Sequence, residues 1–166
     1  MRLAQFITTQ MESILVEWEA FAGTMLPAAE HMNALALRDH ASDILNAVAR
    51  DLGTSQTRHA QSEKSQGRAP PTGAAETAAE THAVLRSRSG FDINQLVAEY
   101  RALRASVLQL YLDHHQSSPA QEDLIRFNEA IDESLTASLL RYSSDLDTTR
   151  EQFLGMLGHD LRNPLG

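Results

Sequence analysis

The residues with the clearest chemical potential lie near the end of the sequence, where His159 is followed directly by Asp160 and then by Asn163. An imidazole titrates near neutral pH, so it can act as a nucleophile or carry a proton. A carboxylate beside it can orient the ring and accept its proton. This pattern predicts a reaction site centred on His159, although the spacing alone also fits a surface histidine on a solvated helix end.

A helix through this segment would display His159 to solvent. With about 100° between successive residues, Phe153, Leu157 and Leu161 fall on one apolar face, and His159 lies roughly 200° from the centre of that face. Asn163 falls one turn later on the same side as His159. The elements upstream must therefore hold this helix by its apolar face.

The composition favours a soluble, all-helical protein. Hydrophobic residues make up 42% of the 166 residues and aromatic residues only 5%, and abundant Ala and Leu favour helices over sheets. The net charge of −8 argues against nucleic acid and anionic membranes as partners. The absence of cysteine excludes disulfides and thiolate chemistry. No apolar run approaches the roughly 20 residues of a membrane span, so we expect a cytoplasmic protein.

Apolar residues recur at helical spacing through most of the chain. They predict helices over about 2–25, 33–52, 75–87, 92–115 and 120–163. Asp92 with Gln95, and Ser118 with Gln121, have the form of capping boxes, and Pro119 would occupy the first helical position. Residues 54–73 are polar, contain two prolines and predict a mobile connector, with a short helix around 56–64 as an alternative. The predicted fold class is therefore an all-α helical bundle.

The core of this bundle is expected to be mainly aliphatic, with a few bulky aromatic members. In the first helix the expected stripe is Ile7, Met11, Ile14, Trp18, Phe21 and Met25, and the other bulky members are Phe6, Tyr100, Tyr111, Phe127, Tyr142 and Phe153.

The last predicted helix is too long for the bundle alone. No Gly or Pro interrupts residues 120–152, and a helix continuing to about residue 163 would measure roughly 65 Å at about 1.5 Å per residue. Its C-terminal half must project. Residues spaced alternately by four and three positions predict a coiled-coil seam along this helix. The simplest partner is the same helix of a second subunit. The seam positions are Leu135, Leu139, Tyr142, Leu146, Thr149, Phe153 and Met156.

Two parts of the sequence resemble known families. The segment His159-Asp160-Leu161-Arg162-Asn163-Pro164-Leu165 resembles the H-box of sensor histidine kinases. The segments Glu76 to His82, Gly90-Phe91 and Leu96 to Arg104 resemble the RsbRD-type N-terminal sensory domain, which occurs in stressosome co-antagonists and in cytoplasmic histidine kinases. These resemblances predict a sensory domain at residues 1–145. Residues 146–166 would then be the first helix of a dimerisation and phosphoacceptor domain.

The kinase resemblance implies a role for each matching residue. His159 would be the phosphoacceptor that attacks the γ-phosphate of ATP, and Asp160 would orient the ring and take its proton. Asn163 would position water when the kinase dephosphorylates its response regulator, and Pro164 would bend the helix beyond the site. Gly158 stands where the family usually has serine, and a glycine there softens the helix beside the acceptor.

The resemblance also implies partners and cofactors. It predicts a homodimer joined through the C-terminal helix, the receiver domain of a response regulator as partner, and ATP with Mg²⁺ bound by a separate catalytic domain. The sequence contains no phosphate-cradling loop. We therefore expect it to represent the N-terminal part of a kinase that is inactive alone and binds no cofactor or metal itself.

A second hypothesis is a non-enzymatic, stressosome-like scaffold that oligomerises and binds partner proteins. RsbR-type domains resemble globins without haem, so a globin-like bundle is one expectation. A haem ligand at His31, His40 or His82 is disfavoured, because none lies in an evident aromatic pocket. His114 and His115 end a helix, where an imidazolium interacts favourably with the helix dipole.

Overall fold

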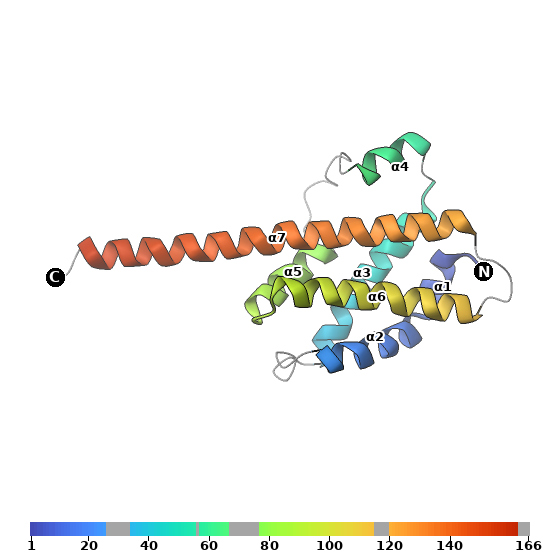
Figure 1. The fold of residues 1–166 in the computed structure, drawn as a ribbon, viewed down its shortest axis with the longest axis horizontal. Coiled ribbons are helices and arrows are strands. Elements are labelled where there is room, and N and C mark those ends of the chain that lie inside the picture. Colours follow the sequence, from blue (N-terminus) through green and yellow to red (C-terminus); the bar gives the residue numbers. More distant parts are fainter. Residues whose placement is uncertain (26–33, 56, 67–76, 115–119, 163–166) are drawn as a thin grey trace.

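The computed structural model describes residues 1–25, 34–55, 57–66, 77–114 and 120–162. In these ranges the chain forms seven α-helices and no strand. They are α1 (Leu3–Thr9), α2 (Met11–Met25), α3 (Ala34–Gly53), α4 (Arg58–Ser65), α5 (Ala78–Arg88), α6 (Ile93–His114) and α7 (Gln121–Arg162). Figure 1 shows the shorter helices gathered beside the N-terminal half of α7, whose C-terminal half projects alone. The predicted all-α bundle with a long C-terminal helix is confirmed.

The predicted first helix is broken into α1 and α2 at Gln10, whose φ of −109° and ψ of 18° leave the helical region. The hydroxyls of Thr8 and Thr9 donate to backbone carbonyl oxygens three and four residues earlier. Such side-chain bonds compete with the regular helical ladder, and they precede the break directly.

Helix starts follow local capping chemistry. The predicted box at the start of α6 is confirmed, because Asp92 Oδ1 accepts from Gln95 N and Gln95 Oε1 accepts from Asp92 N, each at 2.8 Å. A second box, between Thr77 and Glu80, starts α5 later than predicted. The predicted cap at Ser118 lies outside the described residues.

Part of the predicted connector is helical. α4 covers Arg58–Ser65, and Thr57 Oγ1 accepts a hydrogen bond from the Ala60 amide at its start, as an N-cap residue does. The short helix considered as an alternative is therefore present. Residues 67–76 lie outside the described part of the chain.

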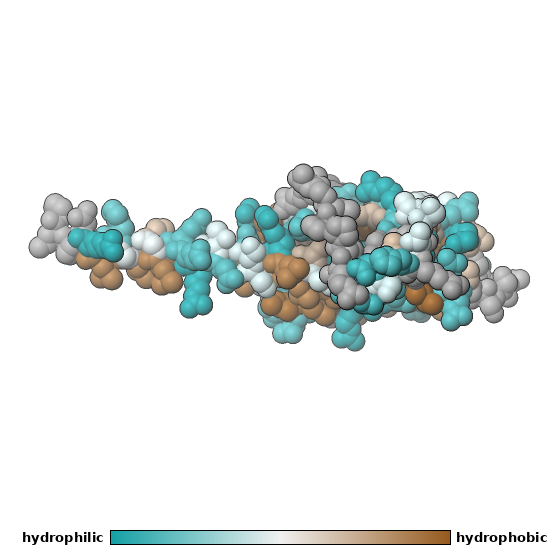
Figure 2. Space-filling model, turned by 90° about the horizontal axis from the view of Figure 1, so that it is seen from above, coloured by the Kyte–Doolittle hydropathy of each residue, from teal (hydrophilic) through white to brown (hydrophobic). Residues whose placement is uncertain are grey.

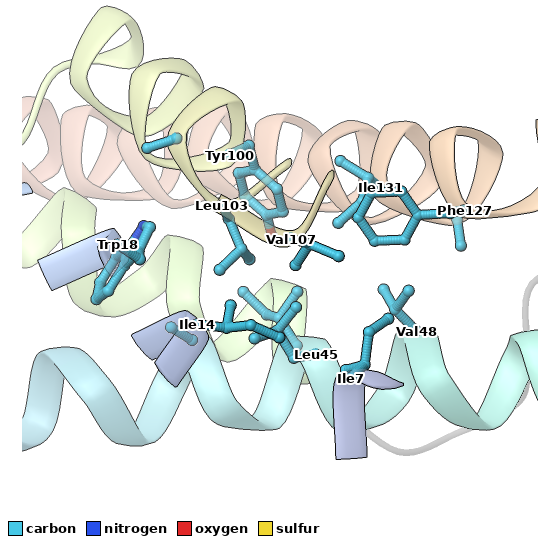
Figure 3. Packing of buried hydrophobic residues seen from close by; sticks show 14 of the residues in the cluster. Ile7, Ile14, Trp18, Leu45, Val48, Tyr100, Leu103, Val107, Phe127 and Ile131 are labelled. Atoms are coloured by element: carbon cyan, nitrogen blue, oxygen red, sulfur yellow. The ribbon is translucent and has the colours of Figure 1, made fainter. Parts of the chain in front are cut away.

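The core lies between α1, α2, α3, α6 and the first half of α7. Figure 3 shows Phe127 and Ile131 of α7 facing Val48 of α3 and Val107 of α6. Most of the predicted aromatic core members are buried. Phe21 and Phe153 were predicted to be buried and are exposed. Ala22 takes the inward position expected for Phe21, and Phe153 lies in the projecting C-terminal half of α7.

The predicted coiled-coil seam is wrong in its first half. Leu135 and Leu139 pack against the core of their own bundle, and Tyr142 is buried there. Spacings of four and three define one apolar face, but they do not determine whether that face meets the same chain or another chain.

Polar side chains of α7 cap the ends of two other helices by bonding to their backbone groups. Asp123 accepts a hydrogen bond from the Leu3 amide at 3.1 Å and pairs with Arg2 at 2.6 Å, at the start of α1. Arg126 Nη2 donates to the carbonyl oxygens of Asp51 and Thr54, at the end of α3. An acid at a helix N-terminus and a cation at a C-terminus satisfy the unpaired backbone groups there and complement the helix dipole.

The bundle ends near Asp145, and the described side chains of α7 after this residue are exposed. We call residues 146–162 the stalk. Figure 2 shows apolar side chains along one edge of it. Within the described residues, no helix is long and apolar enough to cross a bilayer.

Replacing Phe127, which has no exposed surface, by alanine is expected to lower the free energy of unfolding by about 3–5 kcal/mol, because a large cavity would be left in the core. The matched control is Leu140→Ala on the same helix. Leu140 is 69% exposed, so its loss is expected to change stability by about 0.5 kcal/mol or less. Urea unfolding of both variants measures the difference, and equal effects would contradict this assignment of the core.

Candidate functional site

The predicted phosphoacceptor His159 lies near the end of the stalk with its side chain exposed. Asp160 follows in the same helix, but its side chain is outside the described part of the structure. Asn163 lies outside the described residues altogether. The structure therefore places His159 on an accessible helix surface, and the roles of all three residues stay predictions.

The stalk carries an apolar stripe that is continuous with the face packed in the bundle. Leu146, Phe153 and Leu157 fall within about 40° of one another on the helix and continue the line of Leu139. They are exposed to 46%, 60% and 43%. Leu161, 79% exposed, extends this stalk stripe at its edge. His159 lies on the side of the helix away from it.

A second site, which the sequence did not predict, is a buried charge cluster between α5 and α6. It consists of His82, Arg86 and Glu99, exposed to only 2%, 0% and 3%. Glu99 Oε2 lies 3.0 Å from His82 Nε2 and 2.8 Å from Arg86 Nε. Glu99 Oε1 lies 2.8 Å from Arg86 Nη2. One carboxylate therefore serves both partners, with a bidentate contact to the guanidinium.

The charge states of this cluster follow from burial and from its geometry. Burial disfavours the imidazolium and lowers the pKa of His82, despite the hydrogen bond to Glu99. Burial also opposes ionisation of Glu99, but the contacts with His82 and Arg86 outweigh it and lower the carboxyl pKa. Because His82 is neutral, the cation that keeps Glu99 ionised is Arg86. Neutral His82 then donates Nε2–H to Glu99, and its Nδ1 becomes an acceptor.

Other contacts fix the cluster in place. The guanidinium of Arg86 lies over the Phe91 ring, 4.8 Å from its centroid, which is a cation–π geometry. Trp18 Nε1 of α2 donates to the backbone oxygen of Glu99 at 3.3 Å. Beside Glu99, Tyr100 Oη lies 2.7 Å from Ser138 Oγ of α7.

Ser138 links the neighbourhood of the cluster to α7. Its hydroxyl donates to the Ala79 carbonyl of α5 at 2.7 Å, so Tyr100 is the donor in its own bond with Ser138. Burial raises the pKa of Tyr100, which keeps that phenol protonated and able to donate. A single small side chain of α7 thus bonds to both α5 and α6.

A small cavity of about 10 Å³ lies beside His82. It is lined by Trp18, Ala41, Ile44, His82, Glu99, Tyr100 and Leu103. A space of this size holds about one water molecule. Nδ1 of His82 has no hydrogen-bond partner among the described residues. In that part of the chain, no group of three or more His, Asp or Glu residues is placed to hold a metal.

The prediction that His40 and His82 lie outside aromatic surroundings is wrong for His82. Its ring meets Tyr100 edge-on at 5.9 Å and His40 at 6.3 Å, and Trp18 lines the same cavity. His114 ends α6, as predicted, and its Nδ1 lies 2.8 Å from the Leu110 carbonyl oxygen. His31 and His115 lie outside the described residues.

One pattern in the sequence could have indicated the cluster. His82 and Arg86 stand four residues apart, on the helix face that also carries the buried residues Ala79 and Ala83. Glu99 stands beside Tyr100 within the apolar stripe of α6. Charged residues at inward helical positions are rare unless they are paired, so their coincidence in adjacent helices indicates a contact.

The architecture defines a class of protein: an all-α bundle whose last helix continues as a stalk, with a buried charge cluster near the junction. The sequence model of one family, described as RsbT co-antagonist protein rsbRD N-terminal domain, matches residues 12–152. The chain belongs to this family, which indicates a sensory domain of the RsbR type. The match includes the buried cluster and ends before His159. No curated protein and no solved structure matches the chain.

Replacing Glu99 by glutamine is expected to lower the free energy of unfolding at neutral pH by about 3–5 kcal/mol, because the buried guanidinium of Arg86 would lose the carboxylate of Glu99. Glu17→Gln, at an exposed position of α2, makes the same chemical change and is expected to have an effect of about 0.5 kcal/mol or less. Urea unfolding compares the two. A Glu99→Gln variant as stable as the parent would show that the carboxylate does not hold Arg86.

Proposed function

We propose that the chain is the sensory and phosphoacceptor portion of a two-component sensor histidine kinase. The bundle would sense a signal, the stalk would transmit it, and His159 would accept a phosphoryl group. The observation that carries the proposal is a histidine within an H-box-like sequence, exposed on a helix that is continuous with an RsbRD-type bundle.

The chemistry assigned to the site is phosphoryl transfer in two steps. An imidazole nitrogen of His159 attacks the γ-phosphorus of ATP, and the bond to the bridging oxygen breaks so that ADP leaves with that electron pair. Asp160 takes the proton that the ring gives up. The phosphoryl group then passes to a carboxylate of the receiver domain of a response regulator. In the separate dephosphorylating activity, Asn163 positions the water that hydrolyses the phosphoryl group on the response regulator.

The ATP-binding domain of a histidine kinase, added as a separate protein with Mg²⁺ and radiolabelled ATP, is expected to phosphorylate the chain. The label should be lost in His159→Gln and retained in His59→Gln, whose histidine is exposed on α4. A phosphorylated imidazole is labile to acid and stable to base, which distinguishes it from a phosphorylated hydroxyl. Label that persists in His159→Gln would remove His159 as the acceptor.

We further propose that the stalk stripe pairs with the same stripe of a second copy. Its continuity with the packed face of α7 supports this, because one apolar line runs from the bundle core onto the exposed helix. A symmetric pair would cover Leu146, Phe153 and Leu157 on both chains and leave each His159 on the outer surface. This arrangement would keep the acceptor accessible to a catalytic domain and to a receiver domain.

The double variant Phe153→Glu, Leu157→Glu is expected to weaken self-association at least roughly 100-fold. Each apolar side chain contributes about 1.5–3 kcal/mol when buried, and about 1.4 kcal/mol corresponds to a factor of ten. The control is Thr148→Glu, Gln152→Glu, which adds the same charge on the opposite side of the helix. Sedimentation equilibrium measures both, and equal weakening would show that the stripe is not the interface.

A non-enzymatic scaffold is the second candidate. It is favoured by the extent of the family match, which covers the bundle and the base of the stalk but not His159. In this case the chain would self-associate through the stalk stripe and bind partner proteins, and the phosphorylation experiment would yield no label on His159.

A further inference from the structure

We propose that the cluster of His82, Arg86 and Glu99 is a pH-dependent contact, called the latch below. It would determine whether α5 stays packed against the base of the stalk. At neutral pH the closed latch would fix α5 on α6 and α7, and protonation of His82 would release it. This assigns a class of signal, acidification, to the sensory bundle, and it rests on the proposed function only in treating the stalk as the output.

A series of hydrogen bonds connects the latch to the base of the stalk. The carbonyl oxygen of Arg86 accepts from the Phe91 amide at 3.1 Å, in a turn that Gly90 makes with a φ of 79°. The carbonyl oxygen of Phe91 in turn accepts from Tyr142 Oη of α7 at 2.6 Å. Ser87, next to Arg86, donates to Asp145 of α7 at 2.5 Å. The residues around Arg86 are therefore bonded to α7 at the point where the bundle ends.

Among the described side chains, the closed cluster pairs one cation, Arg86 of α5, with one carboxylate, Glu99 of α6. Protonation of His82 would add a second cation, and no further described carboxylate contacts its ring. The other titratable groups that face it are the Tyr100 phenol of α6 and the His40 ring of α3, and neither supplies negative charge near neutral pH.

In the described part of the chain, no hydrogen-bond acceptor lies within reach of the ring nitrogen Nδ1 that would take the added proton. α2 contributes the Trp18 indole, which is a donor only, and the hydroxyl of Ser138 on α7 is already bonded to Ala79 and Tyr100. Nδ1 of His82 therefore has no acceptor among the described residues. The imidazolium would keep only its bond to Glu99, which it would share with Arg86. Burial of this extra charge is unfavourable, so an imidazolium at this position favours a state in which α5 opens to water.

The pH range follows from the direction of the shift. His82 in the closed state has a pKa below its ordinary value of 6.5, so the open state binds the proton more tightly. The closed state is fully favoured above about pH 6.5 and becomes less favoured as the pH falls below that value. Each pH unit between 6.5 and the closed-state pKa raises the opening equilibrium constant roughly tenfold. Glu99, whose pKa is also lowered, loses its contribution only below 4.5.

Hydrogen exchange of the whole chain between pH 8 and 5, corrected for the intrinsic pH dependence of exchange, tests the latch. Amides of α5 and of the base of α7 are expected to exchange roughly tenfold faster for each pH unit between about 6.5 and the closed-state pKa of His82. His82→Gln is expected to abolish this dependence, because its Nε2 can still donate to Glu99 but does not titrate. His59→Gln, at an exposed position, should behave as the parent. A parent without the dependence, or a His82→Gln variant that keeps it, would overturn the proposal.

A second measurement on the unmodified chain covers the case in which His82→Gln does not fold. NMR of histidine labelled in its ring gives the titration midpoint of His82, and fluorescence of Trp18, the only tryptophan, reports on the same cavity. The midpoints of His82 titration and of the Trp18 fluorescence change are expected to coincide below pH 6.5, and exchange should begin to accelerate near pH 6.5 and level off near that midpoint. A His82 midpoint at or above 6.5 would exclude the latch. None of these readouts depends on His159, so failure of the kinase proposal would leave them unchanged.

Discussion

The fold depends on one physical constraint, which is that the apolar face of α7 is longer than the bundle that can cover it. Phe127, Ile131 and Tyr142 fill the core, and the same face continues as the exposed stalk stripe. The covered half gives the helix its position in the bundle. The uncovered half is apolar surface that costs free energy in water until another surface covers it.

Polar side chains of α7 complement this packing at defined points. Asp123 and Arg126 bond to the ends of α1 and α3, and Ser138, Tyr142 and Asp145 bond to α5 or to the turn after it. Apolar contacts tolerate small sliding movements, whereas hydrogen bonds to particular backbone groups fix the helix along its axis. The last three of these bonds all connect to the neighbourhood of the buried cluster, so the base of the stalk depends most directly on α5.

The sequence predicted the fold well because periodicity and caps are local. The stripe of α6 and the box at Asp92 follow from spacing alone, and so does the projecting end of α7. The partner of each face is a tertiary property, so Leu135 and Leu139 were assigned to a second chain instead of their own bundle. The cluster was missed for the same reason, since His82 and Glu99 meet only when α5 packs on α6. For the predicted phosphoacceptor, motif resemblance points to His159, and the structure adds only that this side chain is exposed.

The composition of the buried cluster argues for a role beyond holding α5 and α6 together. A buried ion pair contributes little net stability, because desolvation of the charges offsets most of their attraction. Apolar side chains of similar volume would join the two helices at least as well. Stability alone therefore does not account for a histidine, an arginine and a glutamate with a cavity beside them. A neutral histidine that bonds to the shared carboxylate makes the contact depend on pH. The contact lies near the junction between the bundle and the stalk.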